Sequence, residues 1–358
     1  AAQRAGDPTD AASLKDALAG NLCRCTGYGP ILAAGAAMGP DPDAKGVAGL
    51  AKALAAIQPA EGLALEHKGR RFFAPRSGDE LAAVFEANPD ATILAGGTDV
   101  GLWVTKQQRI LDTVISLNDA ADLRAIDDEG GAIRSGAAVR YADAHAALAG
   151  LHPAFGDLLR RLGGLQVRNL GTVCGNIANG SPIGDMPPAL IAAGATLVLR
   201  KGVARREMPL EAYFLAYGKQ DRRPGEFVEA VIVPKLPKGR VFSIAKLSKR
   251  FDQDISAACA GINIGVSNGQ VTDARIAFGG MAATPKRAAA CEAALTGQPW
   301  TRATVEAGAE ALAQDFTPIT DMRASADYRL EAARNVLIRA FLEAEGAPSV
   351  RDAVAVTA

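Results

Sequence analysis

Two glycine-rich segments contain most of the residues whose types and spacing could do chemistry. Residues 93–100 read ILAGGTDV, and residues 171–185 read GTVCGNIANGSPIGD. Because glycine has no Cβ, successive backbone N–H groups can approach one negatively charged group closely. In the first segment Gly96, Gly97 and the Thr98 hydroxyl suit the diphosphate of a dinucleotide. A plain turn is an equally good interpretation of these residues taken alone.

The second segment is more specific. Asn176 and Asn179 tolerate a left-handed backbone, which predicts a turn around Cys174. Asp185 adds a carboxylate suited to a ribose or ribityl hydroxyl. Neither segment has the Gly-x-Gly-x-x-Gly spacing, and the chain has no Gly-x-x-x-x-Gly-Lys-Ser/Thr motif. The pattern therefore disfavours both a Rossmann site and a P-loop.

A pair of cysteines, Cys23 and Cys25, lies near the start of the chain. Two thiolates this close suit one side of a [2Fe–2S] cluster, which needs four ligands. The other cysteines (Cys174, Cys259 and Cys291) are scattered and do not complete such a set. The pair is therefore half of a cluster site, or two unrelated thiols in a turn. The three histidines lack zinc-ligand spacing.

Composition narrows the class of protein. The 358 residues are 49% hydrophobic and 22% charged, and 39 basic side chains balance 39 acidic ones. This balance argues against nucleic-acid binding through a strong overall positive field. No apolar stretch is long enough to cross a bilayer, no secretory signal is recognised, and five scattered cysteines do not suggest a disulfide framework. We therefore expect a cytoplasmic protein, and, because the chain begins at Ala1, a fragment or a processed product.

The elements that position these residues alternate irregularly. Strands at 92–95 and 113–117 would hold the first glycine-rich segment, and a helix at 189–193 would follow the second. Asn268-Gly269 predicts a hairpin turn. The remaining strands are expected at 123–126, 132–135, 196–200, 227–233, 241–247, 256–266 and 271–278, and the remaining helices at 11–19, 30–38, 47–57, 142–151, 157–162, 285–295, 301–313 and 325–345. This order favours the α+β class over a doubly wound parallel sheet.

Taken together, the chain resembles the small flavin and iron–sulfur subunits of xanthine dehydrogenases in the molybdenum hydroxylase family. The matching stretches, in the family's order, are residues 20–28, 94–100, 175–185, 219–226, 246–255 and 277–281. The resemblance implies an α+β fold with a two-subdomain FAD-binding domain. Its expected divisions are a remnant of a helical [2Fe–2S] domain (1–39), a linker (40–66), the FAD-binding domain (67–236), a C-terminal α+β cap (237–346) and a tail (347–358).

The same resemblance implies roles for individual residues. Tyr217 and Asp254 would lie near NAD, and Cys23 and Cys25 would be two of the four cluster ligands. The residues expected to bind FAD are Ile93, Leu94, Ala95, Gly96, Gly97, Thr98, Asp99, Val100, Leu162, Gly171, Thr172, Val173, Cys174, Gly175, Asn176, Asp185, Val228 and Lys246.

By this resemblance the chain would be the electron-output subunit of a xanthine dehydrogenase. A large partner subunit would bind molybdopterin and oxidise the purine, and electrons would pass through [2Fe–2S] clusters to FAD and then to NAD. The expected assembly is a hetero-oligomer of two or four chains, without nucleic acid or membrane. The alternatives are a molybdenum hydroxylase acting on an aldehyde, nicotinate or an aromatic thioester, and a docking fragment without flavin.

Several features depart from the family pattern. The amino-terminal ferredoxin-like domain is missing, and so is the Cys-x-x-Cys pair that should precede Cys23. Leu162 stands where an aromatic residue is common, and Gln253 replaces an acid found in some relatives. The cysteine turn in the same chain as the flavin domain nevertheless favours the xanthine type over carbon monoxide dehydrogenase, whose flavin subunit is separate.

Overall fold

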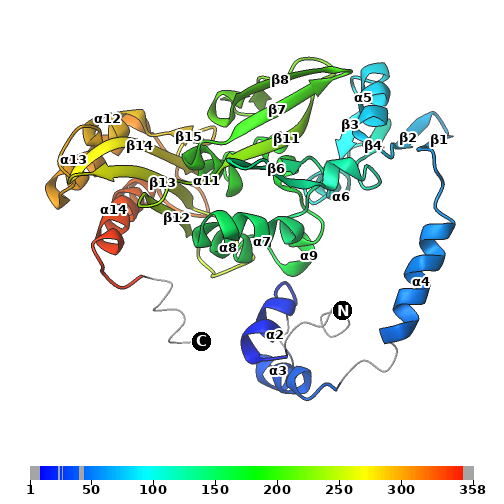
Figure 1. Ribbon diagram of the computed structural model, residues 1–358, viewed down its shortest axis with the longest axis horizontal. Helices are drawn as coiled ribbons and strands as arrows, with labels where there is room; N and C mark the ends of the chain where they lie inside the picture. The colour runs from blue at the N-terminus through cyan, green and yellow to red at the C-terminus, as the bar shows by residue number, and fades with distance from the viewer. Residues whose placement is uncertain (1–8, 23–24, 26, 40–43, 350–358) are drawn as a thin grey trace.

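A computed structural model describes residues 9–22, 25, 27–39 and 44–349. The first elements are helices, and the Asp10 side chain caps the first of them by accepting the N–H groups of Ala12 and Ser13, each at 3.0 Å. Figure 1 shows that α4 stands away from the sheets, whereas α2 lies next to α9 and α3 packs on α2. The three helices are α2 (Ala11–Ala17), α3 (Tyr28–Ala36) and α4 (Ala44–Ala56).

A four-stranded sheet follows, in the order β1-β2-β4-β3. The first two strands form an antiparallel hairpin, whereas β4 pairs in parallel with both β2 and β3. The sheet comprises β1 (Leu63–His67), β2 (Arg70–Ala74), β3 (Thr92–Leu94) and β4 (Thr113–Ser116), and its helices are α5 (Gly78–Ala87) and α6 (Val100–Thr105). Residues 95–99 connect the end of β3 to the start of α6. We call them the first loop.

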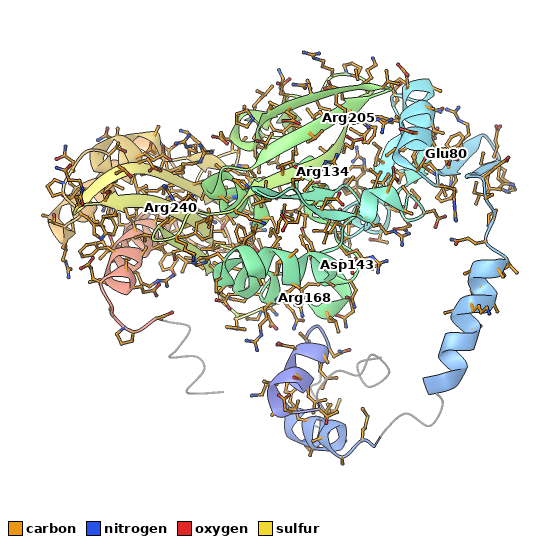
Figure 2. All side chains as sticks on the ribbon, viewed as in Figure 1. Glu80, Arg134, Asp143, Arg168, Arg205 and Arg240 are labelled. Atoms are coloured by element: carbon orange, nitrogen blue, oxygen red, sulfur yellow. The ribbon has the colours of Figure 1, made fainter. Side chains whose placement is uncertain are left out.

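A second, five-stranded antiparallel sheet has the order β5-β6-β11-β7-β8. Its strands are β5 (Ile126–Asp128), β6 (Ala132–Gly136), β7 (Thr196–Lys201), β8 (Ala204–Pro209) and β11 (Phe227–Pro234), and a small hairpin is formed by β9 (Phe214–Ala216) and β10 (Lys219–Gln220). Arg134 and Arg205 on this sheet (Figure 2) both donate to the buried carboxylate of Glu229. Its helices are α7 (Tyr141–Leu151), α8 (Pro153–Arg160), α9 (Leu165–Arg168), α10 (Val173–Asn179) and α11 (Met186–Ala193), with 3-10 turns at Asp122–Arg124 and Leu210–Tyr213.

The C-terminal part has its own four-stranded antiparallel sheet, in the order β12-β13-β14-β15, and its own hydrophobic core. The Asn268-Gly269 turn joins β13 to β14, as predicted, and both of its residues have positive φ. The Phe155 ring of α8 packs 5.4 Å from that of Phe242, which joins the two halves. The elements are β12 (Val241–Leu247), β13 (Ala258–Ser267), β14 (Gln270–Gly279), β15 (Lys286–Arg287), α12 (Ala289–Leu295), α13 (Arg302–Asp315) and α14 (Ala326–Ala344).

Two local predictions were wrong. The helix expected from residue 285 begins only at Ala289, because Lys286 and Arg287 pair with β14 as a short edge strand. The turn expected around Cys174 is the helix α10, since the Thr172 hydroxyl caps its first turn and Val173 and Ile177 bury one face.

Candidate dinucleotide site

The two glycine-rich segments lie against each other in the structure. A Cβ built on Gly96 would fall 2.0 Å from the carbonyl oxygen of Leu170 and 2.7 Å from Cα of Gly171. Both neighbours are backbone atoms, so no side-chain rotation could relieve this contact. The first loop therefore requires glycine at position 96 to pack against the chain that leads into α10.

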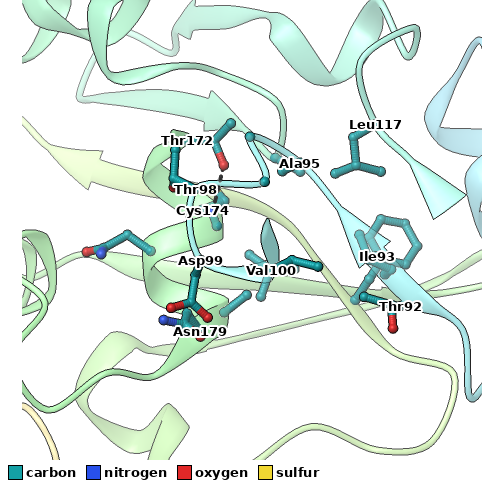
Figure 3. Close-up of a pocket in the computed structure, with 18 of the residues that line it drawn as sticks. Thr92, Ile93, Ala95, Thr98, Asp99, Val100, Leu117, Thr172, Cys174 and Asn179 are labelled. Atoms are coloured by element: carbon teal, nitrogen blue, oxygen red, sulfur yellow. Dashed lines mark hydrogen bonds between the residues drawn. The ribbon is translucent and has the colours of Figure 1, made fainter. Parts of the chain in front are cut away.

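A cavity of about 450 Å³ opens where the two segments meet. Figure 3 shows its wall, with the first loop passing in front of α10. The predicted site residues on this wall are Ile93, Ala95, Gly96, Gly97, Thr98, Asp99, Val100, Thr172, Cys174, Gly175, Asn176 and Val228. The structure thus gathers most of the predicted residues around one space, while the cofactor roles assigned to them stay predictions.

The first loop and the first residue of α6 present a run of unused hydrogen-bond donors. None of the backbone N–H groups of residues 96–100 donates to an acceptor among the described residues. A Cβ on Gly97 would meet nothing closer than a Leu94 methyl carbon at 3.4 Å, and Gly97 has a φ of +68°. An anion can therefore approach these amides directly, which is what a diphosphate needs.

Helix α10 supplies the opposite wall. The Thr172 hydroxyl accepts the N–H of Gly175 at 2.9 Å, which fixes the first turn of the helix. The side-chain oxygen Oδ1 of Asn176 is buried on the cavity wall and has no hydrogen-bond partner within the described chain. A buried polar atom without a partner is costly, so this oxygen suits a ligand hydroxyl or amino group.

Two other groups on the wall stay protonated. Burial raises the pKa of the Cys174 thiol to about 12, and its Sγ lies 3.6 Å from the carbonyl oxygen of Ser135. Burial, together with the negative charge of Asp185, raises the pKa of Tyr141 well above its ordinary value. Neither group is therefore an activated nucleophile at neutral pH.

Asp185 and Lys246 contact each other and are not among the residues that line the cavity. Lys246 Nζ donates to Asp185 Oδ2 at 2.5 Å, and the Ser256 hydroxyl donates to Asp185 Oδ1 at 2.5 Å. The lysine and aspartate side chains are only 3% and 8% exposed. Both oxygens of the carboxylate are thus held by the protein, a pairing that the sequence did not indicate.

The other predicted residues are also off the wall. Leu162 is part of the hydrophobic core, and Leu94, Gly171 and Val173 are not among the residues that line the cavity. Tyr217 is 75% exposed on the turn between β9 and β10. Asp254 accepts the backbone N–H of Arg250 at 2.9 Å. The structure does not bring Tyr217 or Asp254 to the cavity wall, and their proximity to NAD stays a prediction.

Several lining residues were missed from the sequence, namely Trp103, Tyr141, Gln220, Arg222 and Phe227. Trp103 carried a usable signal, because it stands four residues after Asp99 on α6, one helical turn away. Its indole N–H donates to Asp99 Oδ2 at 2.9 Å. Gln220 and Arg222 come from β10 and the loop after it, which only the tertiary fold brings to the cavity.

Of the two predicted cluster ligands, Cys23 and Cys25, the structure describes only Cys25. Cys23 lies outside the described residues, and Cys25 is an exposed free thiol. Within the described part of the chain, no three His, Cys, Asp or Glu side chains gather in a way that could hold a metal ion. None of the described helices is both long and apolar enough to cross a membrane.

Comparisons with known proteins identify the family. The family model "FAD binding domain in molybdopterin dehydrogenase" matches residues 66–236, and "CO dehydrogenase flavoprotein C-terminal domain" matches residues 243–344. The xanthine dehydrogenase FAD-binding subunit of Escherichia coli O157:H7 is 30% identical over 264 residues, which cover 73% of this chain and 90% of that subunit. This chain belongs to the FAD-binding subunits of the molybdenum hydroxylase family. It is therefore a flavoprotein component of an oxidoreductase.

Subunits of other molybdenum hydroxylases are similar in sequence to this chain to about the same extent. The carbon monoxide dehydrogenase medium chain of Hydrogenophaga pseudoflava is 29% identical and is covered to 95%. A solved structure of that organism's carbon monoxide dehydrogenase, lacking the Mo-pyranopterin moiety of its cofactor, superposes with a TM-score of 0.71 over 77% of this chain and 96% of the matched one. This match confirms the predicted α+β flavoprotein fold. The Emericella nidulans xanthine dehydrogenase is 29% identical, and this chain spans 20% of its length.

The cavity fits the cofactor that the family implies. The free amides of the first loop suit the diphosphate of FAD, and Asn176 Oδ1 suits a donor on its sugar or ring portion. Gly97 keeps the approach to these amides open. The fit rests on backbone donors, as expected where a ligand must come within hydrogen-bond distance of the main chain.

Proposed function

We propose that this chain is the electron-output subunit of a xanthine dehydrogenase. In this function FAD carries electrons that leave a molybdenum centre on a partner chain, by way of [2Fe–2S] clusters, and delivers them to NAD as hydride. The partner would be a large molybdopterin-binding subunit that oxidises xanthine or hypoxanthine to urate. The assembly would be a cytoplasmic hetero-oligomer of two or four chains.

The observation that carries the flavin part of this proposal is the run of five free amides at the mouth of the cavity. Such a run is suited to binding an anionic ligand. The protein's own contribution to the chemistry is then to hold and orient the flavin, because the cofactor supplies the redox reaction. The first loop and α10 provide the rigid frame for this, since Gly96 fixes their mutual position.

One feature of this chain supports the xanthine type within this proposal. Cys23 and Cys25 precede the flavin domain in the same chain, and two relatives named as xanthine dehydrogenases are chains several times longer than this one. The cysteines would bind one side of a cluster whose other ligands come from elsewhere.

The test uses the full complex purified from its native host. We expect it to release FAD when it is denatured, to oxidise xanthine with reduction of NAD, and to lose its oxidised flavin absorbance when NADH is added without oxygen. If the complex oxidises carbon monoxide or an aldehyde but not xanthine, the proposed substrate is wrong. If NADH does not reduce the flavin, NAD is not the electron acceptor.

A further inference from the structure

One cationic side chain lines the cavity, that of Arg222, and it forms no ion pair with a described carboxylate. Among the residues that line the cavity only Asp99 and Arg222 are charged. Asp99 already accepts the Trp103 indole N–H. The neutral amides of the first loop donate to an anion but cannot balance a full charge, and a dinucleotide diphosphate carries two negative charges. Arg222 is therefore the residue on this wall that can balance part of that charge.

The acidic residues near Arg222 are Asp221 and Glu226, and both form ion pairs with Arg206 instead. Arg206 on β8 pairs with Glu226 at 2.8 Å and with Asp221 at 3.3 Å. These hydrogen bonds from Arg206 hold the pKa of Glu226 below its ordinary value despite partial burial, so its carboxylate stays charged and paired. Arg222 consequently forms no ion pair with any described carboxylate.

The Arg222 guanidinium is nevertheless held in place. Its Nη1 donates to the backbone carbonyl oxygen of Glu226 at 3.0 Å. Its Nε and Nη2 donors have no acceptor among the described residues, which leaves one edge of the group available. An arginine presents such an edge to a phosphate as two parallel donors. One anchored nitrogen and one free edge at the mouth of a cavity are suited to binding a phosphate.

We propose that Arg222 is the charged contact for a nucleotide diphosphate in this cavity. The inference rests on the proposed flavin site and adds to it one side chain from the matching stretch 219–226, to which no individual role was assigned from the sequence. Two ligands share the required chemistry, since FAD and NAD each carry a diphosphate. The contact is made to one of these two, and the experiment below separates them.

The matched control is Arg223, the next residue along the chain. It carries the same charge and is also exposed, but it does not line the cavity. Its side chain takes part in no hydrogen bond or ion pair within the described chain. Arg222→Gln and Arg223→Gln therefore change the net charge equally and differ in their access to the cavity. Thermal melting of both variants checks that each folds like the unaltered chain.

The first arm measures the affinity for FAD by flavin fluorescence over a series of salt concentrations. If Arg222 contacts the FAD diphosphate, Arg222→Gln weakens binding about 10- to 100-fold and flattens the salt dependence, whereas Arg223→Gln changes it less than about twofold. Arg222→Lys should recover part of the loss, because it keeps the charge without the paired donors.

The second arm measures NADH binding to the FAD-loaded chain. Arg222→Gln could leave the affinity for FAD unchanged and weaken NADH binding about 10- to 100-fold, while Arg223→Gln changes neither. This result would assign the contact to the diphosphate of NAD. Equal behaviour of Arg222→Gln and Arg223→Gln in both arms would overturn the inference. Failure of the unaltered chain to bind FAD at all would instead overturn the proposed function, so the two failures are distinguishable.

Discussion

Lys246 Nζ lies 2.5 Å from Asp185 Oδ2 in a site that is almost closed to solvent. Lys246 belongs to β12, and Asp185 directly precedes α11, so the pair links the C-terminal sheet to the flavin-binding part of the chain. Ser256 completes the arrangement by donating to the other carboxylate oxygen. Removing one charge of such a pair leaves the other buried without a counter-charge.

Asp185→Ala should therefore destabilise the protein by about 3–5 kcal/mol. Adding Lys246→Met to the same chain should recover more than half of that loss, because the stranded charge is gone. Urea unfolding measures both. Glu306→Ala is the control, since its exposed pair with Arg302 should contribute less than about 1 kcal/mol. Equal losses in the single and the double variant would contradict this explanation.

Gly96→Ala should separate the two segments of the cavity wall. The added Cβ would fall on the Leu170 carbonyl oxygen, and overpacking against a fixed neighbour costs about 1–3 kcal/mol. FAD affinity should fall with it, because the free amides of the first loop would move. Gly101→Ala is the matched control, since a Cβ there meets nothing within 4 Å and alanine favours the helix. Equal FAD affinities in the two variants would count against the role of the first loop.

Asn176→Ala should change binding and stability in opposite directions. Without ligand, the variant should be as stable as the unaltered chain or more stable by about 0.5 kcal/mol, because a partnerless buried oxygen is removed and alanine suits a helix. FAD binding should weaken by about 5- to 30-fold, since the ligand loses an acceptor. Calorimetric melting and flavin titration separate the two effects. A loss of stability in the ligand-free variant would show that Asn176 is structural instead.

Lowering the pH should destabilise the folded C-terminal part, because it protonates the Asp321 carboxylate. Partial burial opposes ionisation, but the N–H groups of Arg323 and Ala324 and the buried Arg329 guanidinium lower the pKa of Asp321 to about 2. A lowered pKa stabilises the folded state above the unfolded value of 3.8, and this stabilisation is lost as the pH falls from about 4 towards 2. Asp321→Asn should be less stable than the unaltered chain at pH 6, and the difference should shrink at pH 2.5 in urea melts. A difference that stays constant with pH would contradict this assignment.

The sequence predicted the parts of the fold that local chemistry determines. The Asn268-Gly269 hairpin follows from two residues that accept positive φ, and the cap of α2 follows from Asp10. Residues of both glycine-rich segments line one cavity, while their role in binding FAD stays a prediction. In each case the signal lay within a few neighbouring residues.

The rest depended on contacts between distant residues. Strand β1 was missed because all five of its residues are exposed, including Leu63 and Leu65, so its pattern marks no buried face. The engagement of Asp185 by Lys246 and Ser256 joins positions 61 and 71 residues apart. Likewise, Arg222 reaches the cavity only through the position of β10 beside α10.

The most direct test of the account follows Trp103, which lies on the cavity wall, in a chain that has only two tryptophans. Trp300 packs against Phe341 in the C-terminal part, so Trp300→Phe leaves Trp103 as the sole reporter. Titrating this ligand-free variant with FAD should quench the tryptophan emission until one flavin per chain is bound. Flavin that binds while the Trp103 emission stays unchanged would place the cofactor elsewhere and contradict the assignment of this cavity.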